Sequence, residues 1–197
     1  LGAGLTFYHP KWECLDFYNN GLNIIFPNNY IPWDFRHEKR LPGRYRLAYC
    51  SHVVEHIPES SIKSFLENVY RAMVKNGIFR IVVPDADLGY QAYGDKRIDF
   101  FSIYFRKICQ FVHRDIKKEY HLEFLLLYYF ATSKVFNGLF TEKVALEIRN
   151  AYKELNQKEF LDFLTSDIKS NSSNGMDHVN WFNYKKLELL LQEAGFT

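Results

Sequence analysis

The fold of this chain is decided by residues 45–87, which read YRLAYCSHVVEHIPESSIKSFLENVYRAMVKNGIFRIVVPDAD. The stretch opens with a short apolar run, continues through a segment whose apolar residues recur every three or four positions, and closes with a second apolar run. Such runs are typical of strands buried on both faces of a parallel sheet, and the recurrence is typical of an amphipathic helix. The sequence therefore predicts a strand at 46–51, a helix at 60–76 and a strand at 78–84.

The boundaries of the predicted helix have signals of their own. Pro58 precedes the helix, and the hydroxyl of Ser60 or Ser61 is suited to cap its first amides. Gly77 follows, and we expect this glycine to end the helix in the left-handed conformation. The second strand is expected to stop at Pro84, which cannot donate a ladder hydrogen bond.

A strand-helix-strand unit of this kind predicts where a ligand binds. The crossover between parallel strands is right-handed in almost every case, and ligands bind beyond the carboxyl ends of the strands. The side chains expected at that edge are those of Ser51, His52, Glu55, His56, Asp85 and Asp87.

Three stretches of the same region carry a family resemblance, namely YCSHVVEHI at 49–57, ENVYRAMVKNG at 67–77 and RIVVPD at 80–85. They resemble class I S-adenosylmethionine-dependent methyltransferases. More narrowly, they are similar to a small bacterial group, methyltransferase type 11-like, with the pattern SSHVLEH, RVLKPGG and RIVVPD. The chain departs from that pattern at Asn76, where the group usually has Pro-Gly-Gly.

The resemblance implies a three-layer α/β fold with a doubly wound, mainly parallel sheet whose strands are ordered 3-2-1-4-5. It implies a single methyltransferase domain over residues 1–197, with a helical insertion at 95–168 that caps the carboxyl edge and a mobile loop at 169–183. The terminal strands of the group have no counterpart here, so the sequence looks truncated at both ends. S-adenosylmethionine is the implied cofactor, S-adenosylhomocysteine its product, and no metal is implied.

Two features outside the central stretch suit a nucleoside. Gly2 and Gly4 form a Gly-x-Gly turn that lets the backbone approach a ligand closely. Asp16, at the end of a strand predicted at 12–17, is placed to accept hydrogen bonds from ribose hydroxyls, although a turn role suits it equally. With the resemblance, the predicted cofactor site comprises Gly2, Ala3, Gly4, Asp16, Phe17, Asp34, Phe35, Ser51, His52 and Glu55.

Transfer of a methyl group to a hydroxyl needs a base whose pKa lies near neutrality. The candidates are His56, His178 and Asp85, and His178 is favoured because it follows a polar Ser/Asn/Gly loop. The alternative for His178 is a structural role, either bonded within the loop or capping the helix predicted at 184–194.

The same region also spells H-x-x-E-H over residues 52–56, a zinc-peptidase pattern when it lies on a helix. A strand precedes it and Ile57-Pro58 breaks any helix within one turn, so we expect no metal there. Glu55 and His56 could instead hydrogen-bond to backbone amides of the turn.

The bulk composition limits the partners. A net charge of +2 without a long basic run predicts no binding to nucleic acid, and the longest apolar run, residues 124–131, is too short to span a membrane. Three widely spaced cysteines predict free thiols in a reducing compartment, so a cytoplasmic protein is expected. The predicted partner is a small, polar methyl acceptor such as a sugar.

Aromatic residues are concentrated after residue 90, in predicted helices at 98–112, 120–132, 144–155 and 160–164. Tyr128, Tyr129 and Phe130 cannot all face one side of a helix, which makes a homodimer contact a reasonable hypothesis.

Two other functions stay open. The first is a catalytically inactive, methyltransferase-like binding module. The second is an NAD-binding oxidoreductase, which the absence of a third glycine and the short spacing from Gly4 to Asp16 disfavour.

Overall fold

The computed structural model describes residues 1, 11–16, 30–34, 40–41, 43–105, 118–136, 140–166, 168 and 178–197. These residues form two compact units, each described by itself. Unit 1 holds the described residues of 1–84 and 184–197, and unit 2 holds those of 85–168 and 178–183.

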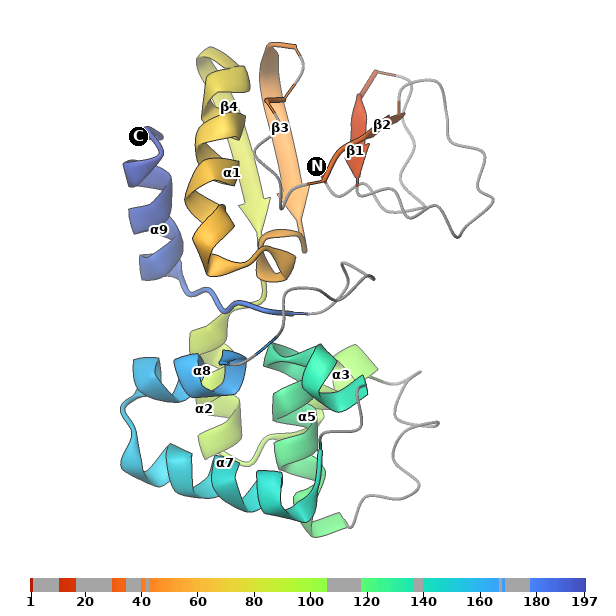
Figure 1. Ribbon diagram of the computed structural model, residues 1–197, viewed down its shortest axis with the longest axis vertical. Coiled ribbons are helices and arrows are strands. Elements are labelled where there is room, and N and C mark those ends of the chain that lie inside the picture. Colours follow the sequence, from red (N-terminus) through yellow and green to blue (C-terminus); the bar gives the residue numbers. More distant parts are fainter. Residues whose placement is uncertain are drawn as a thin grey trace. The chain divides into compact units, whose positions relative to one another are not determined.

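Unit 1 contains the short strands of the protein (Figure 1). β1 (Cys14–Asp16) pairs in parallel with β2 (Tyr30–Pro32), and β3 (Tyr45–Ser51) pairs in parallel with β4 (Met73–Val82). The turn η1 (Val54–His56) and the helix α1 (Glu59–Ala72) connect β3 to β4, and α9 (Tyr184–Glu193) packs beside α1. The described strands thus form two separate two-stranded sheets, so the continuous sheet ordered 3-2-1-4-5 stays a prediction.

The predicted strand-helix-strand unit is confirmed, but the end of its helix is wrong. α1 stops at Ala72, because Met73 already adopts an extended conformation and pairs with Tyr45. Residues 74–77 then bulge out before Ile78 pairs with Leu47. The last turn of the predicted helix is therefore part of β4, because its first residue pairs with β3.

Two smaller expectations about α1 are also wrong. The left-handed residue is Asn76, with φ of 61°, and not Gly77. Glycine is needed at 77 for a different reason, since a Cβ there would lie 3.1 Å from the carbonyl oxygen of Tyr45. No side chain caps the first turn, where the amide of Ser61 donates to the carbonyl of Pro58 at 2.8 Å, so neither Ser60 nor Ser61 serves as the cap.

The core of unit 1 lies along one face of α1. Phe65 packs against Trp33, with ring centroids 6.3 Å apart, so the helix reaches the segment that follows β2. On the side of α9, Phe196 contacts the rings of Tyr70 and Phe79. The apolar face predicted from the sequence is confirmed, and its fully buried members are Ile62, Phe65, Leu66 and Val69.

The strand β3 is less buried than the sequence predicts. Leu47 is 45% exposed, and its neighbour on β4, Ile78, is 65% exposed. The expectation that both strands are buried on both faces is therefore wrong, because parallel strands are buried only where other elements pack on the sheet.

Unit 2 is helical and includes two helices that the sequence did not predict, α2 (Ala86–Gly94) and α6 (Thr132–Phe136). The other helices are α3 (Ile98–Phe105), α5 (His121–Phe130), α7 (Glu142–Glu154) and α8 (Gln157–Thr165), with a short turn η3 (Lys118–Tyr120) before α5. α5, α7 and α8 confirm the helices predicted at 120–132, 144–155 and 160–164. No helix in the described part of either unit is long and apolar enough to cross a membrane.

The core of unit 2 is aromatic and surrounds α5. Phe160 and Phe101 are fully buried, and Tyr129 and Phe130 are nearly so. Tyr128 is partly buried and packs against the same core. The three consecutive aromatic residues that suggested a homodimer contact thus pack within unit 2, and they do not form an exposed aromatic surface.

A buried ionic cluster joins three helices of unit 2. Glu123 of α5 is only 3% exposed and accepts hydrogen bonds from Tyr93 of α2 at 3.1 Å and from Arg149 of α7 at 2.9 and 3.0 Å. Burial and the neighbouring Glu123 raise the pKa of Tyr93, which therefore stays a neutral donor. With its charge paired in this way, Glu123 can be accommodated in the interior.

Candidate functional site

Asp16 and Asp34 lie at the same end of the pair β1–β2. The strands are in register, with Cys14 opposite Tyr30 and Asp16 opposite Pro32. The amide of Trp33 donates to the carbonyl of Asp16 at 2.8 Å, which extends the ladder by one bond. Because the strands are parallel, Asp16 and the nearby Asp34 both follow a carboxyl end, as the sequence predicted.

Ser51 and His52 lie at the carboxyl end of the pair β3–β4. Ser51 is opposite Val82, and the amide of His52 donates to the carbonyl of Val82 at 3.0 Å. His52 then takes a left-handed conformation, with φ of 54°, and the chain turns sharply into η1. The backbone of this turn is satisfied by main-chain bonds, since His56 and Ile57 donate to the carbonyls of Val53 and Val54 at 3.0 Å.

Glu55 is the unusual residue of this turn. It is 1% exposed, and its Oε1 lies 3.0 Å from Nδ1 of His52. The hydrogen bond to Glu55 raises the pKa of His52. The other oxygen, Oε2, is buried and has no hydrogen-bond partner among the described residues. A buried carboxylate oxygen without a donor is unfavourable by about 1–3 kcal/mol, so a ligand that supplies a donor would be stabilised there.

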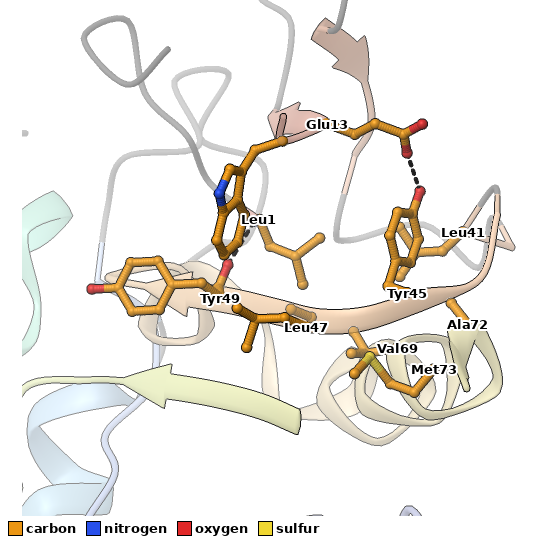
Figure 2. A pocket seen from close by; sticks show the side chains of 11 residues that line it. Leu1, Glu13, Leu41, Tyr45, Leu47, Tyr49, Val69, Ala72 and Met73 are labelled. Carbon is orange, nitrogen blue, oxygen red and sulfur yellow. Dashed lines mark hydrogen bonds between the residues drawn. The ribbon is translucent and has the colours of Figure 1, made fainter. Parts of the chain in front are cut away.

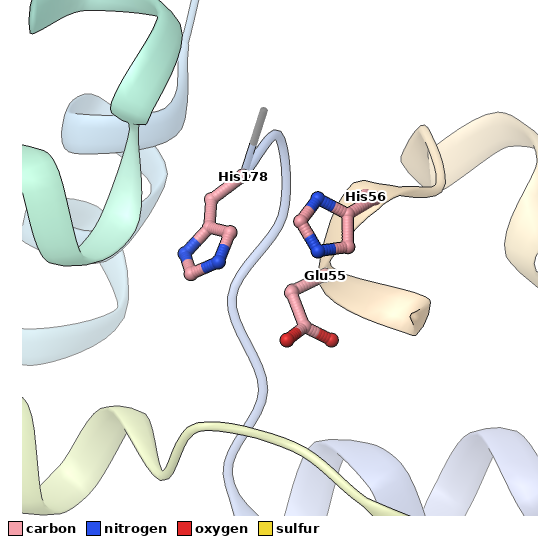
Figure 3. A group of neighbouring side chains, drawn as sticks. All are labelled: Glu55, His56 and His178. Atoms are coloured by element: carbon pink, nitrogen blue, oxygen red, sulfur yellow. The ribbon is translucent and has the colours of Figure 1, made fainter. Parts of the chain in front are cut away.

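The pattern H-x-x-E-H does not lie on an α-helix. Its residues occupy the turn from His52 to His56, and only 54–56 form a short 3-10 helix. Figure 3 shows Glu55 and His56 projecting from this turn in unit 1, and it also draws His178 on a segment of unit 2. The helical geometry on which the zinc-peptidase pattern depends is therefore absent from this turn.

His178 is held in a defined orientation within unit 2. Its amide donates to Oγ1 of Thr132 at 2.8 Å, and its Nδ1 lies 2.7 Å from the carbonyl oxygen of Tyr129. A carbonyl can only accept, so Nδ1 carries the proton and the neutral ring has its lone pair on Nε2. In this tautomer Nε2 is the nitrogen that can accept a proton.

The segment from His178 to Asn183 is fixed along unit 2. Phe182 forms a parallel bridge with Asp85 and accepts from the amide of Ala86 at 2.8 Å, while Trp181 donates from Nε1 to Asp162 at 2.8 Å. The mobile loop over 169–183 stays a prediction, since residues 178–183 make these contacts and 169–177 lie outside the described residues. No local sequence signal reveals these contacts, because their partners lie far away in the chain.

Asp85 has a structural role that its sequence context did not reveal. It is the N-cap of α2, where its carboxylate accepts from the amide of Asp87 at 2.9 Å. Asp87 in turn accepts from the side chains of Gln157 and Asn183. A carboxylate engaged as a helix cap is a weaker candidate for a base than His178.

Five of the predicted cofactor residues, Gly2, Ala3, Gly4, Phe17 and Phe35, lie outside the described residues. Leu1 is described, and its main-chain nitrogen donates to the carbonyl of Tyr49 at 2.7 Å. Leu1 lines a hollow together with Trp12 and Glu13, which precede β1, and with Tyr49 of β3.

Two further observations bear on the site. Cys14 and Cys50 are buried free thiols, as predicted, and burial raises the pKa of Cys50 to about 12, so that it stays protonated. Sequence reasoning missed a hollow in unit 1 between β1, β3 and the end of α1 (Figure 2). None of the predicted cofactor residues lines it.

Comparisons of the chain with protein-family models, curated proteins and solved structures found no match.

Proposed function

We propose that this chain is an S-adenosylmethionine-dependent methyltransferase of the cytoplasm that acts on a small polar molecule such as a sugar. The observation that supports the proposal most is the chemistry at the carboxyl ends of the strands of unit 1. Carboxylates follow β1 and β2, and a turn with a buried, half-satisfied Glu55 follows β3. This is the edge at which parallel α/β proteins bind nucleosides.

The residues present suit the groups of that cofactor. Asp16 and Asp34 offer acceptors for ribose hydroxyls and for the adenine amino group. Oε2 of Glu55 lacks a donor in the described structure, and the amino or hydroxyl groups of the cofactor are donors of the right kind. Bound S-adenosylmethionine would supply an electrophilic methyl group on its sulfonium. The chain itself has to bind and orient the cofactor and accept a proton from the acceptor.

We assign the proton-accepting role to His178. The bond from Nδ1 to the carbonyl of Tyr129 fixes the ring and leaves the basic lone pair on Nε2. Asp85 is occupied as a helix cap, and His56 remains the second candidate.

Calorimetric titration with S-adenosylhomocysteine tests the cofactor site. We expect the wild type to bind with a Kd on the order of micromolar, near −8 kcal/mol. Asp16→Ala should weaken binding about 10–100-fold, because hydrogen bonds to a charged group are lost. Asp99→Ala is the matched control, since Asp99 is an exposed carboxylate of unit 2 paired with Arg97, and it should bind like the wild type.

The alternatives predict different titrations. A binding module without a cofactor pocket gives no heat with S-adenosylhomocysteine, and an oxidoreductase binds NAD in its place. Wild-type binding that is equally strong in Asp16→Ala would contradict the assignment of the site.

The role of His178 is tested with Asn and Ala variants, using an acceptor found in a screen of small polar metabolites. The side-chain amide of Asn can still donate to Tyr129 but cannot serve as a base. Both variants should lower kcat about a hundredfold and keep the affinity for S-adenosylhomocysteine. Full turnover in His178→Asn would show that the residue only orients its loop.

A further inference from the structure

The junction of α5 and α6 in unit 2 presents two hydrogen-bond acceptors that lie three residues apart in the chain. α5 ends at Phe130, and Ala131 leaves the helical conformation, with φ of −148° and ψ of 61°. The last four carbonyls of an α-helix find no amide within their own helix, and the carbonyl of Tyr129 is one of these. Thr132 begins α6, is only 6% exposed and adds a hydroxyl oxygen.

His178 donates to both of these acceptors. Its amide bonds to Oγ1 of Thr132 at 2.8 Å, and its Nδ1 bonds to the carbonyl of Tyr129 at 2.7 Å. The first bond holds the main chain of His178, and the second holds its ring. If the first bond is lost, the ring can move away from Tyr129, and a ring without that acceptor can carry its proton on either nitrogen.

Gly89 of α2 sets how closely α5 can approach. A Cβ at this position would lie 2.8 Å from the ring of Phe130 and 2.9 Å from the ring of Tyr129, which is closer than real Cβ atoms come. Both rings belong to the buried core of unit 2, where close packing leaves little room to give way. Alanine at position 89 would therefore displace the end of α5, and the carbonyl of Tyr129 with it.

We propose that Gly89, Tyr129 and Thr132 are positioning residues for His178, and that they keep its proton on Nδ1 so that Nε2 can accept a proton from the methyl acceptor. α2 sets the place of α5, α5 supplies the carbonyl, and α6 supplies the hydroxyl oxygen. The inference rests on the proposed function for the role of His178, whereas the order of the ring can be measured without any turnover.

Nitrogen NMR of the imidazole rings measures that order directly. At alkaline pH the ring is neutral, and the chemical shifts of its two nitrogens show which of them carries the proton. The signals of His178 are identified by their loss in His178→Asn. We expect the wild type to carry the proton predominantly on Nδ1.

Thr132→Val removes the hydroxyl and keeps the shape of the side chain. It should move the ring of His178 toward a mixture of the two tautomers and lower kcat about five- to tenfold, with the affinity for S-adenosylhomocysteine unchanged. Thr132→Ser keeps the oxygen and should restore both quantities. Thr165→Val is the control, because the hydroxyl of Thr165 donates within α8, to the carbonyl of Leu161 at 3.0 Å.

The two glycines of α2 give a second, matched comparison. A Cβ at Gly94 would also crowd a tyrosine, but this is Tyr152 of α7, whereas Gly89 faces Tyr129. The two alanine variants thus differ mainly in whether the crowded tyrosine is the one that accepts from His178. Gly89→Ala should shift the ring signals of His178, and Gly94→Ala should leave them as in the wild type.

The outcomes separate this proposal from the proposed function. Wild-type ring signals in Thr132→Val would overturn the proposal even if the chain transfers methyl groups, and so would a wild-type kcat in a variant whose ring signals have shifted. If Gly89→Ala does not fold, Thr132→Val decides alone. A wild type that transfers no methyl group would refute the proposed function, and with it the positioning role, whatever the ring signals show.

Discussion

Unit 1 and unit 2 differ in how completely they bury their apolar side chains. Unit 2 closes an aromatic core around α5 and pairs the one charge of Glu123 within it. Unit 1 has two short parallel pairs, and large apolar side chains on β3 and β4 remain exposed. Helices satisfy their own backbones, whereas strands need neighbours. The described helices of unit 2 therefore bury their apolar side chains against one another, whereas the described sheets of unit 1 have strand edges that no described strand pairs with.

The largest expected effect is the difference in the free energy of unfolding that is lost when one apolar side chain of each unit is truncated to Ala. Phe160→Ala in unit 2 should lower the free energy of unfolding by about 3–5 kcal/mol, because the ring is fully buried among other aromatic residues. Leu47→Ala in unit 1 should cost less than about 1 kcal/mol, because the side chain is half exposed. Urea denaturation of both variants measures this. Equal losses would show that β3 is buried more deeply than described.

A smaller effect is expected at the junction of α1 and β4. Gly77→Ala should destabilise by about 1–2 kcal/mol, since the new methyl group would crowd the carbonyl oxygens of Val74 and Tyr45. Asn76→Gly should be neutral or stabilising by less than about 1 kcal/mol, because glycine adopts positive φ without strain. Urea denaturation discriminates the structure from the sequence pattern at Asn76, because the pattern places Asn76 in the helix, where glycine would be destabilising.

The smallest effect is a pH dependence in the turn after β3. Glu55 raises the pKa of His52 in the folded protein, so this pair stabilises the fold fully below the unfolded value near 6.5. The contribution is lost as pH rises through the folded pKa. His52 is about half exposed, so the effect should stay below about 0.5 kcal/mol. Unfolding curves of the wild type and His52→Ala should converge at alkaline pH. A gap that widens with rising pH would contradict this pairing.

Local sequence patterns predicted the helices whose formation depends mainly on residues that are close together in the chain. The apolar residues at 144–155 and 160–164 predicted α7 and α8, and the helix predicted at 184–194 is α9, which Gly195 follows with φ of 104°. α2 was missed because its Gly89 suggests no helix. That glycine is explained by packing, since a Cβ there would lie within 2.9 Å of the rings of Tyr129 and Phe130.

The position of the candidate site at the strand ends could be predicted from the sequence, but the long-range contacts of its residues could not. The strand ends placed Asp16, Asp34 and His52 at carboxyl edges from sequence alone. The contact from His178 to Tyr129 and the bridge from Phe182 to Asp85 join residues far apart in the chain, and no local pattern encodes such partners. For the same reason the hydrogen bonds of the segment at 178–183 could not be predicted from the sequence.

The central claim is that the carboxyl edges of unit 1 bind a nucleoside, and an NMR titration with S-adenosylhomocysteine tests it most directly. We predict saturable shifts of the backbone amides of Asp16, Asp34, Ser51 and His52, while amides in the buried core of unit 2, such as those of Leu126 and Phe160, stay unchanged. Saturable binding that shifts the unit 2 core amides and leaves all four edge amides unmoved would contradict the claim.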